Sequence, residues 1–205
     1  CGVDASLEFF AEAGRRGADF VICHHGLSWG DSLKRITGLN YRKVAFLVRH
    51  DMALYACHLP LDAHPRLGNN ALLSDALGLK KLRPFYFDHG LFFGFQARVA
   101  IPRAELVRRL QCATGAKPRL IPGGPQICRR IGVVSGGAGD GLKKAAEEGM
   151  DTFITGEGPH WTYGMAEDLG LNVLYGGHYA TETFGVMAIA AHLSAKFRLP
   201  WTFLE

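Results

Sequence analysis

Histidines and acidic residues recur at matching places in this chain. The segments "MALYACHLPLD" (residues 52–62) and "NVLYGGHYATE" (172–182) share one frame: Leu-Tyr, two small residues, His, three residues and an acid. An adjacent pair, His24 and His25, follows the apolar run "DFVI". Imidazoles and carboxylates without thiolates form a ligand set that holds zinc, iron or manganese and leaves positions open for water. The sequence therefore indicates a divalent-metal site.

Each motif alone has a simpler explanation. A His-His pair in a loop is more often a surface or hydrogen-bonded pair than a ligand pair, and a single His-x-x-x-Glu arises by chance in many chains. The conjunction favours metal binding, because His-His follows one expected strand, His-x-x-x-Asp the next, and His-x-x-x-Glu stands at a duplicated position.

Apolar runs rich in β-formers alternate with amphipathic helical patterns, which is typical of an α/β fold. We expect helix 5–17 to end at a glycine and helix 102–115 to have proline at its first position. Residues 43–48 are either a strand or the end of a helix. Residues 90–101 are expected to form a strand pair, and either Asn69 or Asn70 is expected to cap a helix that runs to Leu77. The other expected strands are 17–23, 52–57, 129–135 and 150–156, with a further helix at 140–149.

The two ends of the chain resemble each other. Residues 2–26 align with residues 132–158 with a two-residue gap, and a Leu-Tyr-x-x-His segment follows each. This pattern predicts one domain over 1–205, with pseudo-repeats 1–80 and 129–205 and a connecting segment 81–128. We expect duplicated strand-helix-strand units in a layered α/β/α structure, with the site between the two halves. Strand ends from both halves would then bring the ligands together. These ligands are His24, His25, Asp62, His178 and Glu182.

Other polar positions near these motifs have two interpretations. Glu157 stands in the second repeat where His25 stands in the first, so it is a candidate proton carrier or a structural residue. His160 and Trp161 follow closely and could contact a substrate. The loop "SGGAGDG" (135–141) could receive a phosphate at a helix start or could be a tight turn that needs glycine. It lacks the P-loop and dinucleotide-binding spacings.

Composition sets the class of protein. With 205 residues, 48% hydrophobic and 20% charged, the chain is an ordinary globular protein, and a net charge of +4 argues against a nucleic-acid partner. No apolar run reaches the roughly 18–20 residues that span a bilayer, and no leader pattern opens the chain. Five cysteines form no Cys-x-x-Cys pair, which favours reduced thiols. We expect a soluble cytoplasmic protein, and because "CGVDAS" looks like the tail of a strand, natural residues upstream of Cys1 are expected to be missing.

Four segments closely resemble the Nif-three-like dinuclear-metal family, in particular its short bacterial type-two GTP cyclohydrolase I homologues. They are "ADFVICHHGLSWGDS", "HLPLDAHPRLGNNALL", "FITGE" and "GGHYATETFGV", and the likeness runs from Gly2 to Leu204. Many relatives have His-His-Pro where this chain has His-His-Gly. The resemblance implies two divalent metal ions of unknown identity.

The resemblance also implies roles for single residues. His25, Asp62 and Glu182 would hold one ion and His24 and His178 the other, with Glu182 bridging both. His58 would be a neighbour of the ions rather than a standard ligand, which leaves it, with Glu157, as a candidate for moving protons.

The implied function is a metal-dependent hydrolase of the GTP cyclohydrolase I type 2 kind, acting on a small nucleotide-like substrate. The alternative is a non-catalytic, metal-stabilised scaffold or interaction protein, because members of the family form toroidal homo-hexamers. Whether this chain is an enzyme stays open at this point.

Overall fold

A computed structural model describes residues 1–28, 35–88 and 90–205. The chain forms two compact units. Unit 1 comprises Cys1–Leu61 together with Gly185–Glu205, and unit 2 is the continuous segment Asp62–Phe184. The short helix α3 (Leu59–Ala63) and the start of α9 (Thr183–Phe197) contain the two places where the chain passes from one unit to the other.

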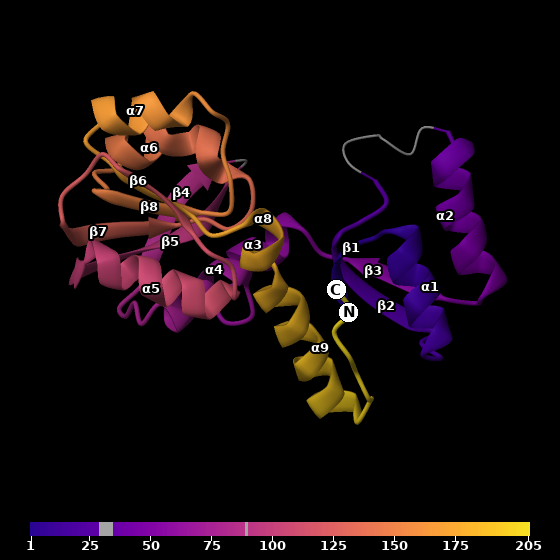
Figure 1. Cartoon of the computed structure of the whole chain (residues 1–205). Coiled ribbons are helices and arrows are strands. Elements are labelled where there is room, and N and C mark those ends of the chain that lie inside the picture. Colours follow the sequence, from indigo (N-terminus) through magenta and orange to yellow (C-terminus); the bar gives the residue numbers. More distant parts are fainter. Residues whose placement is uncertain (29–34, 89) are drawn as a thin grey trace. The chain divides into compact units, whose positions relative to one another are not determined.

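Unit 1 is built on a three-stranded parallel sheet in the order β1-β2-β3. Its other long elements are the helices α1, α2 and α9 (Figure 1). Because the strands are parallel, their carboxyl ends lie at one edge of the sheet. The bounds are β1 Gly2–Asp4, α1 Leu7–Arg15, β2 Phe20–His25, α2 Gly38–Arg49 and β3 Ala53–Ala56.

The core of unit 1 joins two distant parts of the sequence. Helix α1 begins where the Ser6 hydroxyl accepts a hydrogen bond from the Phe9 amide at 2.9 Å, and it buries Phe9 and Phe10. Leu204 packs into the same buried cluster, and its amide donates to the Cys1 carbonyl at 2.9 Å. Unit 1 therefore needs its last segment to complete its core.

Unit 2 is a six-stranded mixed sheet in the order β4-β5-β7-β8-β9-β6. Strands β7, β8 and β9 are parallel, while β4, β5 and β7 pair antiparallel and β6 pairs antiparallel with β9. The strands are β4 Arg83–Asp88, β5 Leu91–Pro102, β6 Arg119–Pro122, β7 Ile127–Val133, β8 Thr152–Thr155 and β9 Asn172–Tyr175. The helices are α4 Asn69–Ala76, α5 Arg103–Thr114, α6 Leu142–Glu147, α7 Thr162–Asp168 and α8 His178–Thr181, with a 3-10 turn, η1, at Ala138–Gly141.

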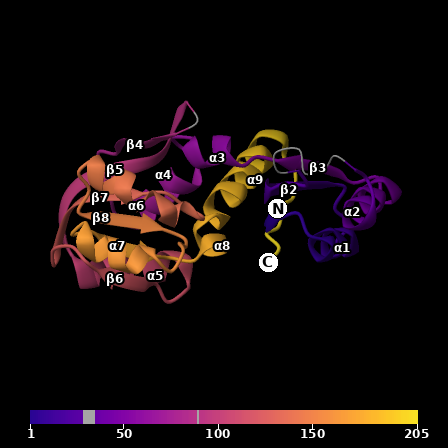
Figure 2. The same cartoon turned by 90° about the horizontal axis from the view of Figure 1, so that it is seen from above.

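Both faces of the unit 2 sheet are covered. Leu73 of α4 and Leu106 of α5 belong to one buried cluster, and Leu142 of α6 and Ala166 of α7 belong to a second. Figure 1 shows α4 and α5 on one face of this sheet and α6 and α7 on the other, and Figure 2 views the same arrangement from above. The expected α/β class and its layering are confirmed.

The predicted duplication has a counterpart in the topology. Unit 1 runs β1-α1-β2-α2-β3-α3 and unit 2 contains β7-α6-β8-α7-β9-α8, and each series forms a parallel ladder in sequence order. The pseudo-repeat boundaries 1–80, 81–128 and 129–205 stay a prediction.

Several predicted elements are corrected. Residues 90–101 are not a strand pair: β5 is one long strand, and its hairpin partner is β4. Residues 43–48 lie in helix α2, so the helical alternative holds. Helix α5 begins at Arg103, and Pro102 precedes it as the capping residue. Residues 29–32 of the "ADFVICHHGLSWGDS" motif lie outside the described residues.

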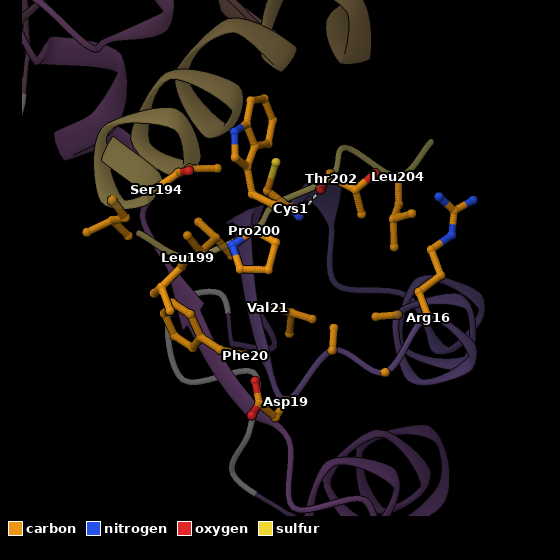
Figure 3. A pocket seen from close by; sticks show the side chains of 17 residues that line it. Cys1, Arg16, Asp19, Phe20, Val21, Ser194, Leu199, Pro200, Thr202 and Leu204 are labelled. Carbon is orange, nitrogen blue, oxygen red and sulfur yellow. Dashed lines mark hydrogen bonds between the residues drawn. The ribbon is translucent and has the colours of Figure 1, made fainter. Parts of the chain in front are cut away.

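Unit 1 also contains a cavity of about 350 Å³ (Figure 3). Its walls are mainly apolar and come from strand β2, helix α9 and the segment after α9, including Phe20, Leu199 and Trp201. Within the part of the chain that is described, no helix has the length and apolar character to cross a membrane.

Candidate metal centre

Unit 1 gathers three imidazoles at one edge of its sheet. His24 and His25 are the last residues of β2, and His58 follows the neighbouring strand β3. One nitrogen from each of these rings lies within 4.8 Å of the others. The ring centroids are 4.9 Å apart for His24 and His25, 4.8 Å for His24 and His58, and 5.4 Å for His25 and His58. This group could hold a metal ion.

Hydrogen bonds orient two of these rings. Nδ1 of His24 lies 3.0 Å from the Cys57 carbonyl, and because a carbonyl only accepts, Nδ1 carries the proton. Nδ1 of His25 lies 2.7 Å from Oδ1 of Asp4. In a neutral imidazole, a proton on Nδ1 leaves the lone pair on Nε2, which is then the metal-binding atom. Metal-binding histidines typically have such a carbonyl or carboxylate partner.

Asp4 was missed by the sequence analysis. It ends strand β1, and the parallel register places it directly beside His25. The signal was present: "GVDAS" ends an expected strand next to the one that carries His-His. An acid at the exit of a neighbouring parallel strand is the residue to examine for support of a candidate ligand.

Unit 2 supplies a second set of donors. His178 begins α8 after strand β9, and Glu182 follows it by one helical turn. Nε2 of His178 lies 3.3 Å from Oε1 of Glu182, and Nδ1 lies 2.8 Å from Oε1 of Glu157. Hydrogen bonding to Glu182, helped by Glu157, raises the pKa of His178 to about 9, although partial burial opposes the shift. With the pKa raised, the His178 ring carries protons on both nitrogens at neutral pH, so a cation that binds Nε2 must displace the Nε2 proton.

Glu157 and Glu182 differ in their surroundings. The side chain of Glu182 is only 4% exposed, whereas that of Glu157 is 65% exposed. Burial of a carboxylate is costly without a positive partner, which fits Glu182 as an acid that binds a cation. Glu157 supports His178 from the outside and stays accessible to water.

Asp62 is held by a buried polar network. Its Oδ1 accepts hydrogen bonds from Nδ2 of Asn69 at 2.8 Å and from the Ser135 hydroxyl at 3.0 Å. Nδ2 of Asn70 donates to the Asp62 carbonyl at 3.3 Å, and Oδ1 of Asn70 accepts from the Ser135 amide at 2.5 Å. Asn69 or Asn70 was expected to cap helix α4, but Gly68 is the capping residue and both side-chain amides donate to Asp62. The two asparagines that follow Asp62 in the sequence therefore hold it in place.

The glycine-rich loop lies against the unit 2 donors. Gly136 has φ +69°, and a Cβ there would lie 2.2 Å from Oε1 of Glu182 and 3.3 Å from Nε2 of His178. The Gly136 amide donates to the Thr181 hydroxyl at 3.0 Å, and the Gly139 amide donates to the Glu157 carbonyl at 3.0 Å. These contacts favour the tight-turn explanation of "SGGAGDG" over phosphate binding. Since Ser135 binds Asp62, one dipeptide touches both predicted acidic ligands.

Other candidates lie away from these contacts. His160 and Trp161 are exposed just before helix α7, and the His160 ring lies 5.6 Å from that of Tyr163. Nδ1 of His64, in the "HLPLDAH" motif, accepts the Leu67 amide at 3.0 Å and so supports a turn.

Comparison with known proteins gives the family. The family model for Duf34/NIF3 (NGG1p interacting factor 3) matches residues 1–205. The chain belongs to the Duf34/NIF3 family. A Deinococcus radiodurans protein named "GTP cyclohydrolase 1 type 2 homolog" is 41% identical over 99% of this chain and 78% of its own length. An Escherichia coli K12 protein of the same name is 36% identical over 100% of this chain and 82% of its own length.

Solved structures in this family have the same fold. The crystal structure of TTHA1606 from Thermus thermophilus matches with a TM-score of 0.89 and 40% identity, covering 100% of this chain and 81% of that one. Reduced HcgD from Methanocaldococcus jannaschii matches with a TM-score of 0.88 and 28% identity, covering 100% and 81%. The resemblance to Nif-three-like proteins is confirmed.

Proposed function

We propose that this chain is a dinuclear, divalent-metal-dependent hydrolase that acts on a small nucleotide-like substrate. The observation that carries the proposal is the way the candidate ligands are oriented. His24, His25 and His178 each use Nδ1 to bind a carbonyl or carboxylate, and a histidine that binds a metal through Nε2 typically has such a partner.

The proposed ligand assignment uses five residues. His25, Asp62 and Glu182 hold one ion, and His24 and His178 hold the other, with Glu182 shared. Imidazole and carboxylate donors accept zinc, iron or manganese, and availability decides between them.

Bound divalent ions supply Lewis-acid chemistry, because they acidify a water molecule and polarise substrate oxygens. The protein must then move protons. Glu157 is suited to this, since its carboxylate contacts His178 and is open to solvent. His58 is the second candidate, because its ring lies within 5.4 Å of two predicted ligand rings.

The substrate class comes from the relatives. Several are named "GTP cyclohydrolase 1 type 2 homolog", which suggests hydrolytic opening of the guanine five-membered ring with release of formate. A cytoplasmic location is part of the proposal. All five cysteines are free thiols, and free thiols persist in a reducing compartment.

The second candidate function is a non-catalytic, metal-stabilised scaffold that assembles as a homo-hexamer. Exposed apolar side chains on unit 1 are the observation behind it, because apolar groups outside the core can contact another protein. Val48 is 74% exposed, Ile36 57% and Phe197 56%. Light scattering of the purified protein measures the assembly directly.

Metal analysis and activity assays separate these functions. We expect the purified protein to contain two divalent ions per chain and to release formate from GTP or to hydrolyse another nucleotide. Glu182→Gln should lose both metal and activity, whereas Glu147→Gln, on the exposed face of α6, should change neither. Retention of two ions by Glu182→Gln contradicts the bridging role. If metal removal lowers only Tm and no nucleotide is hydrolysed, the scaffold function is supported instead.

A further inference from the structure

Parallel strand pairing in unit 1 places His58 beside the His-His pair. Cys23 of β2 pairs with Ala56 of β3, and the Cys57 amide continues this ladder by donating to the Cys23 carbonyl at 3.0 Å. The Cys57 carbonyl in turn accepts from Nδ1 of His24. The backbone therefore fixes the residue before His58 against the ring of His24.

We propose that His24, His25 and His58 form a three-imidazole site that binds one divalent ion without any donor from unit 2. The inference rests on the proposed function and extends it to the state in which the unit 2 donors are not bound: His24, His25 and His58 then share one ion, and unit 1 is the first place where a metal binds. All three residues and their orienting partners, Asp4 and Cys57, belong to unit 1.

The three ring nitrogens need to move only slightly closer together to bind one ion. Four-coordinate zinc binds imidazole nitrogens at about 2.0–2.1 Å, which places them roughly 3.4 Å apart. The nitrogens here lie within 4.8 Å. The planes of His24 and His58 meet at 62° and those of His25 and His58 at 67°, so the rings are turned toward each other rather than stacked face to face. Side-chain rotation can supply the remaining approach.

The donor type determines which ions fit. Three neutral imidazoles suit zinc or cobalt, and a fourth position stays open to water. Manganese and magnesium prefer carboxylate oxygens, and this trio offers none. Zinc should therefore bind the trio, whereas manganese should require Asp62 and Glu182 as well.

A variant without the unit 2 donors tests the proposal. The full chain carrying Asp62→Asn, His178→Gln and Glu182→Gln is titrated with Co²⁺, and the visible absorption of four-coordinate cobalt is recorded. We expect one Co²⁺ per chain, displaced by Zn²⁺ and not by Mn²⁺. Adding His58→Ala should weaken binding on the order of 100-fold or more, since loss of even an outer partner costs 10–100-fold. His58→Cys should restore a cobalt spectrum, and His192→Ala, an exposed histidine of α9, should have no effect.

Two results overturn the proposal: the triple variant binds no Co²⁺, or it binds Co²⁺ equally well after His58→Ala. If the triple variant does not fold, His58→Ala is made in the unaltered chain instead, and Zn²⁺ is titrated into both proteins. The proposal is overturned if the first Zn²⁺ ion to bind does so with the same affinity in both. The outcome is separate from the proposed function, which requires two ions in the unaltered chain.

Discussion

At the scale of single residues, this chain pairs predicted ligands with outer partners. Asp4 accepts from His25, Glu157 accepts from His178, and the Cys57 carbonyl accepts from His24. A carboxylate partner orients an imidazole and also makes it a more basic ligand. The Asp4 and Glu157 contacts can be removed by substitution without changing a predicted ligand.

Asp4→Asn should lower zinc affinity about 10–100-fold, because the amide accepts a hydrogen bond more weakly than the carboxylate and can turn its donor toward Nδ1. Competition with a chromophoric chelator measures the change. Asp19→Asn, an exposed acid of the same unit, is the matched control. Equal zinc affinities for Asp4→Asn and the unaltered protein would show that the 2.7 Å contact does not support the ligand.

The raised pKa of His178 predicts how the metal-free protein responds to pH. The pKa rises from 6.5 to about 9 on folding, so the protonated ring stabilises the folded state fully below pH 6.5. That contribution is lost as the pH rises through 9. In chelator, Tm should therefore fall more between pH 6.5 and 9 for the unaltered protein than for His178→Gln. Parallel Tm profiles for the two proteins would contradict the assignment.

At the scale of elements, the glycine-rich turn before η1 is required by its neighbours. Gly136→Ala should destabilise the protein by about 1–2 kcal/mol from the left-handed backbone alone. The added Cβ would also meet the buried Glu182 carboxylate, so the total should be larger. Urea unfolding measures this as a lower midpoint.

The control for that substitution is Gly164→Ala in helix α7. Nothing lies within 4 Å of a Cβ at Gly164, so alanine should be neutral or stabilising by about 0.5–1 kcal/mol. If both alanine variants unfold at the same urea concentration, close packing at Gly136 is not what demands glycine.

Local patterns predicted many of the elements. Period and capping signals placed α1, β3, β7 and β8, because their apolar faces and glycine ends are written in consecutive residues. Pairing between strands cannot be read from consecutive residues. The segment 90–101 was therefore predicted as two strands, whereas β5 is one long strand that pairs with β4 on one side and β7 on the other.

In the candidate site, too, local sequence patterns identified some residues, and contacts made only in the folded chain determined the others. The histidines and acids themselves were evident from spacing, whereas Asp4 and Ser135 were not, because they reach His25 and Asp62 only through the folded sheet. The amides of Asn69 and Asn70 look like helix caps until Asp62 is placed beside them.

At the scale of the whole molecule, each unit has its own core and its own buried thiol. Cys23 lies in the core of unit 1 and Cys128 in that of unit 2, while Cys112 is exposed on α5. Burial raises the pKa of the Cys23 thiol to about 12 and also raises that of Cys128. Neither thiol is accessible or ionised at neutral pH.

Native alkylation should therefore modify Cys112 quickly and leave Cys23 and Cys128 unmodified until denaturant is added, because the thiolate is the reactive form. Mass spectrometry of peptides from each unit measures the three rates. Labelling of Cys23 as fast as Cys112 in the native protein would show that unit 1 opens readily. Different denaturant midpoints for Cys23 and Cys128 would measure the stability of the two units separately.

The division of the chain into one continuous and one discontinuous unit has a consequence for biosynthesis. Unit 2 is encoded in a single stretch, so a nascent chain can complete it once Phe184 leaves the ribosome. Unit 1 is begun before unit 2 and completed after it, because its sheet precedes Asp62 in the sequence whereas Leu204 follows Phe184. During that interval the buried cluster of unit 1 lacks Leu204, and this is the stage at which a chaperone would have most to protect.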